Sequence, residues 1–200
     1  MKRFCSFLFK PHFPSSLPPA IVFACFAAGL FALNAAPSTS AQDQAHLPKL
    51  LPEAARQGAP GFSLTDADGK PITLSAYRGK VVLLDFWATW CGGCKREIPW
   101  YIEFDKKYRD QGLAAIGVSM DDDGWKAVRP FLAKKIDTET GGNVAMQYPV
   151  VIGNQQLATM YHLTAMPMTL LIDRQGRIAL SYSGVVNKDD FEHDIRQLLN

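Results

Sequence analysis

VVLLDFWATWCGGCKREIP, residues 81–99, is the most informative stretch of this 200-residue chain. Its first part, 81–87, is almost continuously apolar, which is typical of a strand buried on both faces of a sheet. From Gly92 onward apolar residues recur at helical spacing, so we expect a helix over 92–111. Cys91 lies between these two elements, and Cys94 lies in the first turn of the expected helix. The sequence therefore predicts a strand–turn–helix unit with a CxxC motif where the helix begins.

Cysteines at this spacing can close a small disulfide ring. A sulfur at a helix N-terminus lies beside free backbone N–H groups and the positive end of the helix dipole, which stabilise its thiolate. Such sites lower the thiol pKa from about 8.5 to roughly 3.5–7.5. Because the thiolate is the form that attacks a disulfide, we expect Cys91 to be the nucleophile and Cys94 to be the resolving thiol. No cofactor is expected beyond this redox-active pair.

Other roles for the two cysteines fit the sequence less well. A zinc site needs four ligands, and outside the first 41 residues there is no second cysteine pair, so no metal site is expected. The histidines that remain there are His46, His162 and His193. Covalent haem requires a histidine after the second cysteine, where this chain has Lys95. A structural disulfide gains little from so short a loop, and two inert buried cysteines are the remaining alternative.

The rest of the chain extends this unit into an α/β domain. Further strands are expected at 62–65, 71–74, 113–120, 148–152, 168–172 and 178–182. Helices are expected over 125–132, over 157–161 and at the C-terminus, where Asn187 is the expected N-cap. Buried strands that alternate with helices predict a sheet covered on both faces. The acidic run Asp121–Asp123 is interpreted as a solvated loop and not as a metal site.

Residues 1–41 have the three parts of a secretory signal. Three basic residues precede the apolar run AIVFACFAAGLFAL, and small residues follow it up to Ala41, the expected cleavage position. An uncleaved membrane anchor over residues 20–36 is the alternative, because that length is at the lower limit for a membrane span. Both readings predict export to a bacterial periplasm, as a soluble or a tethered protein. We expect residues 42–58 to form a linker and 59–200 to form one domain.

Composition limits the classes of function that remain. The chain is 48% hydrophobic and 20% charged, which is typical of a globular protein. Lys2, Arg3 and Lys10 are the only charged residues in 1–41, so the rest of the chain carries a net charge of −1. This balance gives no electrostatic footprint for nucleic acid. With few exposed apolar runs expected, a monomer is predicted.

A family resemblance rests on these motifs. The stretch 81–99, with APGFSLTD at 59–66 and LSAYRGK at 74–80, resembles the exported TlpA/ResA-like thiol:disulfide oxidoreductases of the thioredoxin superfamily, which are related to the AhpC/TSA redoxins. The similarity covers about 59–199. It implies a thioredoxin-like fold with a central mixed sheet, helices on both faces and an N-terminal hairpin extension. It also implies a central insert at about 125–148, between a strand and a helix.

The resemblance also implies roles for individual residues. Pro167 matches the cis-proline that faces the disulfide, and a cis bond there would orient the Met166 backbone to pair with an extended client. Asp85 matches a buried acid that takes up the proton of the resolving thiol. Glu97 matches a glutamate near the site, although a solvated acid in the first helical turn is an equally good interpretation. Trp90 is expected to offer clients an apolar surface.

The function implied is the reduction of disulfides in client proteins, of the cytochrome c maturation type, with a membrane dithiol as electron donor. A thiol peroxidase of the AhpC/TSA type is an alternative, but Ala88 occupies the position that usually carries a hydroxyl. A non-catalytic binding module with a structural disulfide is a further alternative. One departure is Gly92-Gly93, because relatives usually have proline or a larger residue second. The direction of electron flow does not follow from the sequence.

Overall fold

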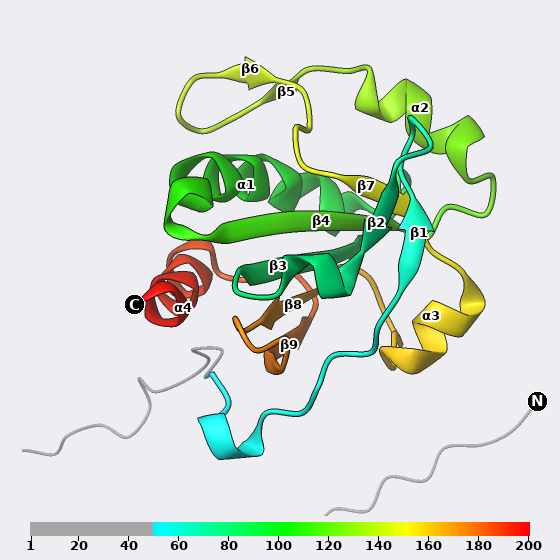
Figure 1. Cartoon of the computed structure of the whole chain (residues 1–200). Coiled ribbons are helices and arrows are strands. Elements are labelled where there is room, and N and C mark those ends of the chain that lie inside the picture. Colours follow the sequence, from blue (N-terminus) through cyan, green and yellow to red (C-terminus); the bar gives the residue numbers. More distant parts are fainter. Residues whose placement is uncertain (1–49) are drawn as a thin grey trace, which may run out of the picture. The chain divides into compact units, whose positions relative to one another are not determined.

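The computed structural model describes residues 50–200, which are built around a five-stranded sheet (Figure 1). The strand order is β7-β4-β3-β8-β9. Strands β3, β4 and β7 run parallel, whereas β8 is antiparallel to β3 and β9 is antiparallel to β8. Their bounds are β3 (Val81–Trp87), β4 (Leu113–Ser119), β7 (Val150–Ile152), β8 (Met168–Ile172) and β9 (Ile178–Ser183). Every residue of β3 and β4 is buried, as their apolar sequences predict.

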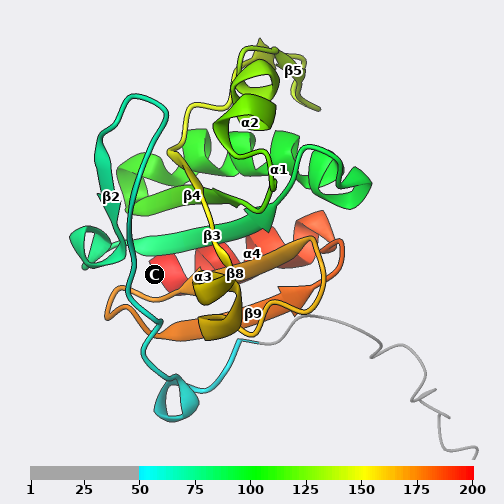
Figure 2. The ribbon, with the colours of Figure 1, turned by 90° about the vertical axis from the view of Figure 1, so that its right-hand side faces the viewer.

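Helices cover both faces of this sheet, as predicted. They are α1 (Gly92–Tyr108), α2 (Trp125–Leu132), α3 (Gln155–Met160) and α4 (Lys188–Leu199). Short 3-10 turns span Glu53–Ala55, Leu74–Tyr77 and Arg109–Gln111. One core cluster joins α1 and α4 to the sheet, and a second joins α3 to its opposite face. Figure 2 shows α3 and the first hairpin in front of the sheet and α4 behind it.

The alternation of side chains along β3 assigns residues to these two clusters. Leu83 and Trp87 pack in the cluster that contains α1 and both cysteines. Leu84 and Phe86 pack in the other cluster. Because successive side chains of a strand point to opposite faces, Asp85 faces the α1 side together with Leu83 and Trp87. The strand therefore brings one carboxyl group to the side of the sheet where the cysteines lie.

Two hairpins accompany the main sheet. The N-terminal one pairs β1 (Ser63–Thr65) with β2 (Pro71–Thr73), which confirms the predicted hairpin extension. The central insert holds α2 and a small hairpin of β5 (Ile136–Asp137) and β6 (Asn143–Val144). The expected position of the insert between a strand and a helix is wrong, because it lies between strands β4 and β7, and helix α3 comes only after β7.

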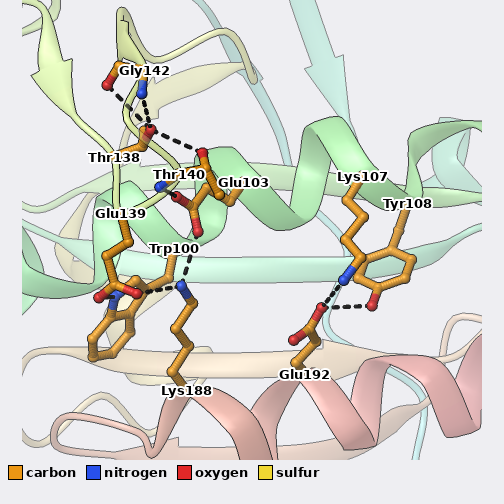
Figure 3. A network of polar contacts seen from close by, with 10 residues as sticks. All are labelled: Trp100, Glu103, Lys107, Tyr108, Thr138, Glu139, Thr140, Gly142, Lys188 and Glu192. Atoms are coloured by element: carbon orange, nitrogen blue, oxygen red, sulfur yellow. Dashed lines mark hydrogen bonds and ion pairs between the residues drawn. The ribbon is translucent and has the colours of Figure 1, made fainter.

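Polar contacts fasten the insert to the helices beside it (Figure 3). The Lys188 ammonium lies 2.9 Å from Glu103 of α1 and also pairs with Glu139 of the insert, at 2.5 Å. Glu139 accepts a hydrogen bond from the Trp100 indole at 2.7 Å, and Glu103 accepts one from the Thr140 backbone N–H at 2.9 Å. The insert is thus held to both α1 and the first residue of α4.

The start of α4 is fixed by its N-cap. Asn187 accepts hydrogen bonds from the backbone N–H groups of Asp189 and Asp190 at 3.0 and 3.2 Å, which confirms the predicted cap. The loop that precedes this cap holds Val185, whose Cγ2 would lie 2.9 Å from a Cβ atom on Gly93 of the CxxC motif.

Part of the predicted linker runs along β9. The Leu51 N–H donates to the carbonyl of Ala179, and Gln57 accepts from the Ile178 N–H, both at 2.8 Å. The predicted leader, residues 1–41, lies outside the described residues. Among residues 50–200, no helix is both long and apolar enough to span a membrane.

Candidate active site

Cys91 and Cys94 form a disulfide at the start of α1. Their Cα atoms are 5.3 Å apart. Cys91 is the N-cap of the helix, and its sulfur accepts a hydrogen bond from the Cys94 N–H at 3.1 Å. Cys91 is 6% exposed and Cys94 is fully buried. An incoming sulfur can thus approach Cys91 from solvent, while Cys94 is shielded behind it.

The turn before Cys91 is held by a carboxylate that we did not predict to be structural. Asp121 accepts hydrogen bonds from the Thr89 N–H at 2.9 Å, the Thr89 hydroxyl at 2.6 Å and the Ser119 hydroxyl at 2.8 Å. It is only 6% exposed, so the interpretation of Asp121 as part of a solvated loop is wrong. Asp122 and Asp123 are exposed, as that interpretation expects. Asp121 fixes the residues that lead from β3 into the CxxC motif.

Pro167 lies against the CxxC turn. The Met166–Pro167 peptide bond is cis, as the resemblance implies. A Cβ atom on Gly93 would lie 3.0 Å from Pro167 Cδ and 2.9 Å from Val185 Cγ2. The Pro167 carbonyl in turn accepts a hydrogen bond from the Gly184 N–H at 2.8 Å. Gly93 therefore allows the proline and the loop before α4 to approach the disulfide closely.

Asp85 is fully buried in the middle of β3. Neither of its carboxyl oxygens has a hydrogen-bond partner among residues 50–200. Burial, and then the nearby charge of Glu97, raise the pKa of Asp85 well above its usual range. This is the environment expected of an acid that gains a proton readily.

Glu97 is also buried, with 0% exposure, so its interpretation as a solvated acid is wrong. One of its oxygens accepts a hydrogen bond from the Val186 N–H at 2.7 Å, and the other has no partner among the described residues. Burial raises the pKa of Glu97 to about 7, against the lowering effects of the Val186 hydrogen bond, Tyr101 and Arg96. A group with this pKa can exchange protons near neutral pH.

The remaining predicted residues lie at the surface of the site. Trp90, next to Cys91, is 65% exposed and is one of the two large apolar side chains exposed within residues 50–200. Met166, which precedes the cis-proline, is half-buried against the α1-side core. The structure thus brings an exposed indole to one side of Cys91 and places a cis-proline against the CxxC turn.

Three polar groups of this region were missed by the sequence analysis. The Tyr101 hydroxyl and the Thr169 hydroxyl are hydrogen-bonded at 2.8 Å, and Thr169 lies opposite Asp85 in the β3–β8 register. The Tyr148 hydroxyl is buried and has no partner in the described part of the chain. No local pattern marks these residues, because each comes from a different segment. A buried, uncompensated acid such as Asp85 is the only signal that such neighbours are needed.

The arrangement is suited to thiol–disulfide exchange. Among residues 50–200, no group of three His, Cys, Asp or Glu side chains is placed to hold a metal ion. A sulfur pair at a helix N-terminus, with two buried acids of raised pKa on the same side of the sheet, can transfer two electrons and accept protons.

Comparison with known proteins agrees with this geometry. The model of the AhpC/TSA family matches residues 55–181. The chain belongs to the AhpC/TSA family. Relatives of this AhpC/TSA protein include the thiol-disulfide oxidoreductases ResA of Geobacillus kaustophilus and Bacillus subtilis. The first is 35% identical over 141 residues, which cover 70% of this chain and 75% of the relative. The second is 31% identical over 142 residues, which cover 70% and 73%.

Solved structures give the same result. A Chlorobium tepidum protein assigned as the thiol:disulfide interchange protein DsbE is similar, with a TM-score of 0.64 and 31% identity, over 72% of this chain and 97% of that one. A second Chlorobium tepidum protein, a thiol:disulfide interchange protein of the thioredoxin family, matches with a TM-score of 0.61 and 26% identity, over 74% and 100%. The thioredoxin-like fold and the predicted enzyme class, a thiol-disulfide oxidoreductase, are confirmed for this AhpC/TSA protein.

Proposed function

We propose that this protein reduces disulfides in exported client proteins through Cys91 and Cys94. The observation that carries the proposed direction is the pair of buried acids, Asp85 and Glu97, on the cysteine side of the sheet. Burial that disfavours the ionised form of these acids also disfavours a thiolate beside them, and an acid that is ionised adds a repelling negative charge. A destabilised thiolate makes the reduced protein a better electron donor. In thiol–disulfide proteins that are strong oxidants, the reduced form is instead stabilised.

The proposed reaction begins on the reduced protein. The Cys91 thiolate attacks one sulfur of the client disulfide, and the other client sulfur leaves as a thiolate. The Cys94 thiol then gives its proton to Asp85 or Glu97, and its thiolate attacks Cys91. The bond between Cys91 and the client breaks as the Cys91–Cys94 disulfide forms. The client gains two electrons and the protein loses two, so a partner dithiol must reduce Cys91–Cys94 again.

Client binding is proposed at the surface formed by Trp90, Met166 and Pro167. The exposed Trp90 indole offers apolar contact area beside the nucleophile. The cis bond before Pro167 orients the Met166 backbone, to which an extended client segment can add as a short strand. Main-chain pairing of this kind accepts many sequences, which suits an enzyme that acts on several proteins.

The cellular setting is proposed from the leader and the relatives. We propose that residues 1–41 direct the protein to the periplasm, either as a cleaved signal or as an anchor over residues 20–36. A membrane dithiol protein then supplies the electrons, and cytochrome c maturation is the proposed use. The protein is proposed to act as a monomer. The names ResA and DsbE, given to the relatives, support the enzyme class on which this setting depends.

The direction is tested by equilibrating the Cys91–Cys94 pair with glutathione buffers of known potential. We expect a potential near that of thioredoxin, about −270 mV. A value near that of the oxidant DsbA, about −120 mV, would overturn the reducing direction.

The match to the AhpC/TSA family suggests a second candidate activity, that of a thiol peroxidase. The position three residues before Cys91 is Ala88, which is fully buried and offers no hydroxyl to bind peroxide. Peroxide consumption by the reduced protein, measured beside the reduction of insulin, separates the two activities. We expect insulin reduction at the faster rate, and turnover of peroxide at a comparable rate would favour the peroxidase.

A further inference from the structure

The turn that joins β3 to α1, residues 88–91, is held from the side of the sheet. The Ala88 carbonyl accepts a hydrogen bond from the Cys91 N–H at 3.1 Å. Thr89 donates twice to Asp121, through its N–H at 2.9 Å and through its hydroxyl at 2.6 Å, and the two bonds go to different carboxylate oxygens. Thr89 is thus tied to the loop after β4 by both its backbone and its side chain, two residues before Cys91.

The acceptor, Asp121, is itself fixed to the sheet. Its carboxylate also accepts from the Ser119 hydroxyl at 2.8 Å, and the Ser119 oxygen accepts from the Asp121 N–H at 3.2 Å. Ser119 is fully buried at the end of β4 and is the register partner of Trp87, the last residue of β3. Hydrogen bonds to a carboxylate are stronger than those between neutral groups. The contact between Thr89 and Asp121 therefore connects the turn to a rigid part of the sheet.

On its other side the turn continues into a flexible sequence. Gly92 and Gly93 follow Cys91, and glycine leaves the backbone more freedom than any other residue. Among the described residues no atom lies within 4 Å of the Cβ position of Gly92, so this side of the motif is open. In the oxidised protein the bond to Cys94 holds Cys91 against α1. Once that bond is reduced, the position of the Cys91 sulfur depends on the turn before it.

This position matters because a helix stabilises a thiolate only over a short range. The Cys91 sulfur accepts from the Cys94 N–H at 3.1 Å, and Cys91 is the N-cap of α1. The helix dipole acts mainly within the first turn. A sulfur that leaves this place loses both contributions, so less of it is present as the attacking thiolate at a given pH.

We propose that Thr89 is a positioning residue of the thiol–disulfide reaction, and that its hydrogen bonds to Asp121 keep the reduced Cys91 sulfur at the N-terminus of α1. This inference rests on the proposed function, because that function makes Cys91 the attacking thiol. Thr89 and Asp121 form and break no covalent bond and transfer no proton. They act only through the backbone of the turn.

Several titratable side chains belong to the segments that meet at Cys91. They are Asp85 of β3, Lys95, Arg96 and Glu97 in the first two turns of α1, and Asp121, Asp122 and Asp123 after β4. The segments 165–167 and 184–187 bring none. Because threonine and serine are neutral, substitutions at Thr89 and Ser119 leave all these groups in place.

The test is the Thr89→Val variant of the full chain, which removes the hydroxyl and keeps nearly the same shape. The reduced protein is alkylated with iodoacetamide across a range of pH, and mass spectrometry identifies the cysteine that reacts. We expect the midpoint of Cys91 alkylation to rise by about half a pH unit. Thr89→Ser keeps the hydroxyl and is expected to keep the wild-type midpoint. A wild-type midpoint in Thr89→Val, or an equal rise in Thr89→Ser, would overturn the role of the Thr89 hydroxyl.

Ser119→Ala is the matched control. It removes another hydroxyl that donates to the same carboxylate, but Ser119 belongs to β4 and not to the turn. Both variants are expected to lower the urea midpoint of the oxidised protein, whereas only Thr89→Val shifts the alkylation midpoint. Equal alkylation shifts in the two variants would show that the effect passes through the charge of Asp121, and would overturn the positioning role.

The same experiment separates this inference from the proposed function. If Cys91 reacts first in the wild type and Thr89→Val leaves its midpoint unchanged, the role of Thr89 is wrong and the proposed function stands. If Cys94 reacts first in the wild type, the proposed function has the wrong nucleophile, and the role of Thr89 is wrong with it.

Discussion

The close approach of Gly93 to its neighbours predicts that Gly93→Ala destabilises the oxidised protein. The added Cβ would lie 2.9 Å from Val185 Cγ2 and 3.0 Å from Pro167 Cδ, distances at which an atom must move. The proline ring is rigid, and the valine methyl belongs to a short branched side chain, so neither yields easily. Gly92, the preceding residue, has no atom within 4 Å of its own Cβ position and is the matched control.

The expected effect can be bounded from two opposing contributions. Overpacking of a filled site costs about 1–3 kcal/mol. Replacing glycine by alanine within a helix returns about 0.5–1 kcal/mol. We therefore expect Gly93→Ala to lower the free energy of unfolding by about 0–2.5 kcal/mol, with a midpoint of about 1 kcal/mol. Gly92→Ala carries only the favourable contribution and is expected to be neutral or slightly stabilising.

Urea unfolding of the disulfide-bonded protein measures both variants, and a double-mutant cycle tests the cause. Val185→Ala removes the nearest atom, so Gly93→Ala should cost about 1 kcal/mol less in the Val185→Ala background. Equal costs in both backgrounds, or equal effects of alanine at 92 and 93, would show that the contact with Val185 does not set the requirement for glycine.

Three further predictions follow from other residues. Asp121→Ala removes the acceptor of three hydrogen bonds and is expected to lower the free energy of unfolding by about 2–4 kcal/mol, whereas Asp122→Ala changes it by less than about 0.5 kcal/mol; similar urea midpoints for the two variants would contradict this. Burial raises the pKa of Asp194 from 3.8 to about 6, so the folded protein loses stability as the pH rises through this range and the carboxyl ionises. Asp194→Asn is therefore expected to stabilise the protein by roughly 1–2 kcal/mol at pH 8 but not at pH 4. An equal gain at both pH values would exclude the carboxylate as the cause. Cys94→Ala is expected to accumulate client proteins disulfide-bonded to Cys91 on non-reducing gels, and their absence would argue against resolution by Cys94.

The local features of the fold were predictable because short segments determine them. The apolar run of β3, the CxxC turn and the helix that follows each have a pattern within about 20 residues, and the structure places them as expected. Asn187 is a similar case, because an N-cap acts on N–H groups two and three residues away. Asp85 could be identified because a lone acid in an apolar strand conflicts with its surroundings.

Long-range contacts were not predictable in this way. Asp121 belongs to a run of acids that resembles any solvated loop, and only the fold brings it to Thr89, 32 residues earlier in the chain. Tyr148 stands at the start of the strand predicted at 148–152, and its ring lies over Gly117, the register partner of Asp85, only because β7 pairs with β4. In both cases the surroundings of the side chain are set by a residue that is distant in the sequence, and not by its own sequence neighbours.

The same distinction bears on the chemistry of the site. A CxxC motif at a helix N-terminus lowers the energy of a thiolate whichever way electrons flow, so the motif alone does not set a direction. The opposing influence that we propose comes from Asp85 and Glu97, which are buried on the cysteine side of the sheet and have raised pKa values. From the proposed balance between helix dipole and buried carboxyls, we expect a change at Asp85 or Glu97 to move the potential of the pair without altering either cysteine.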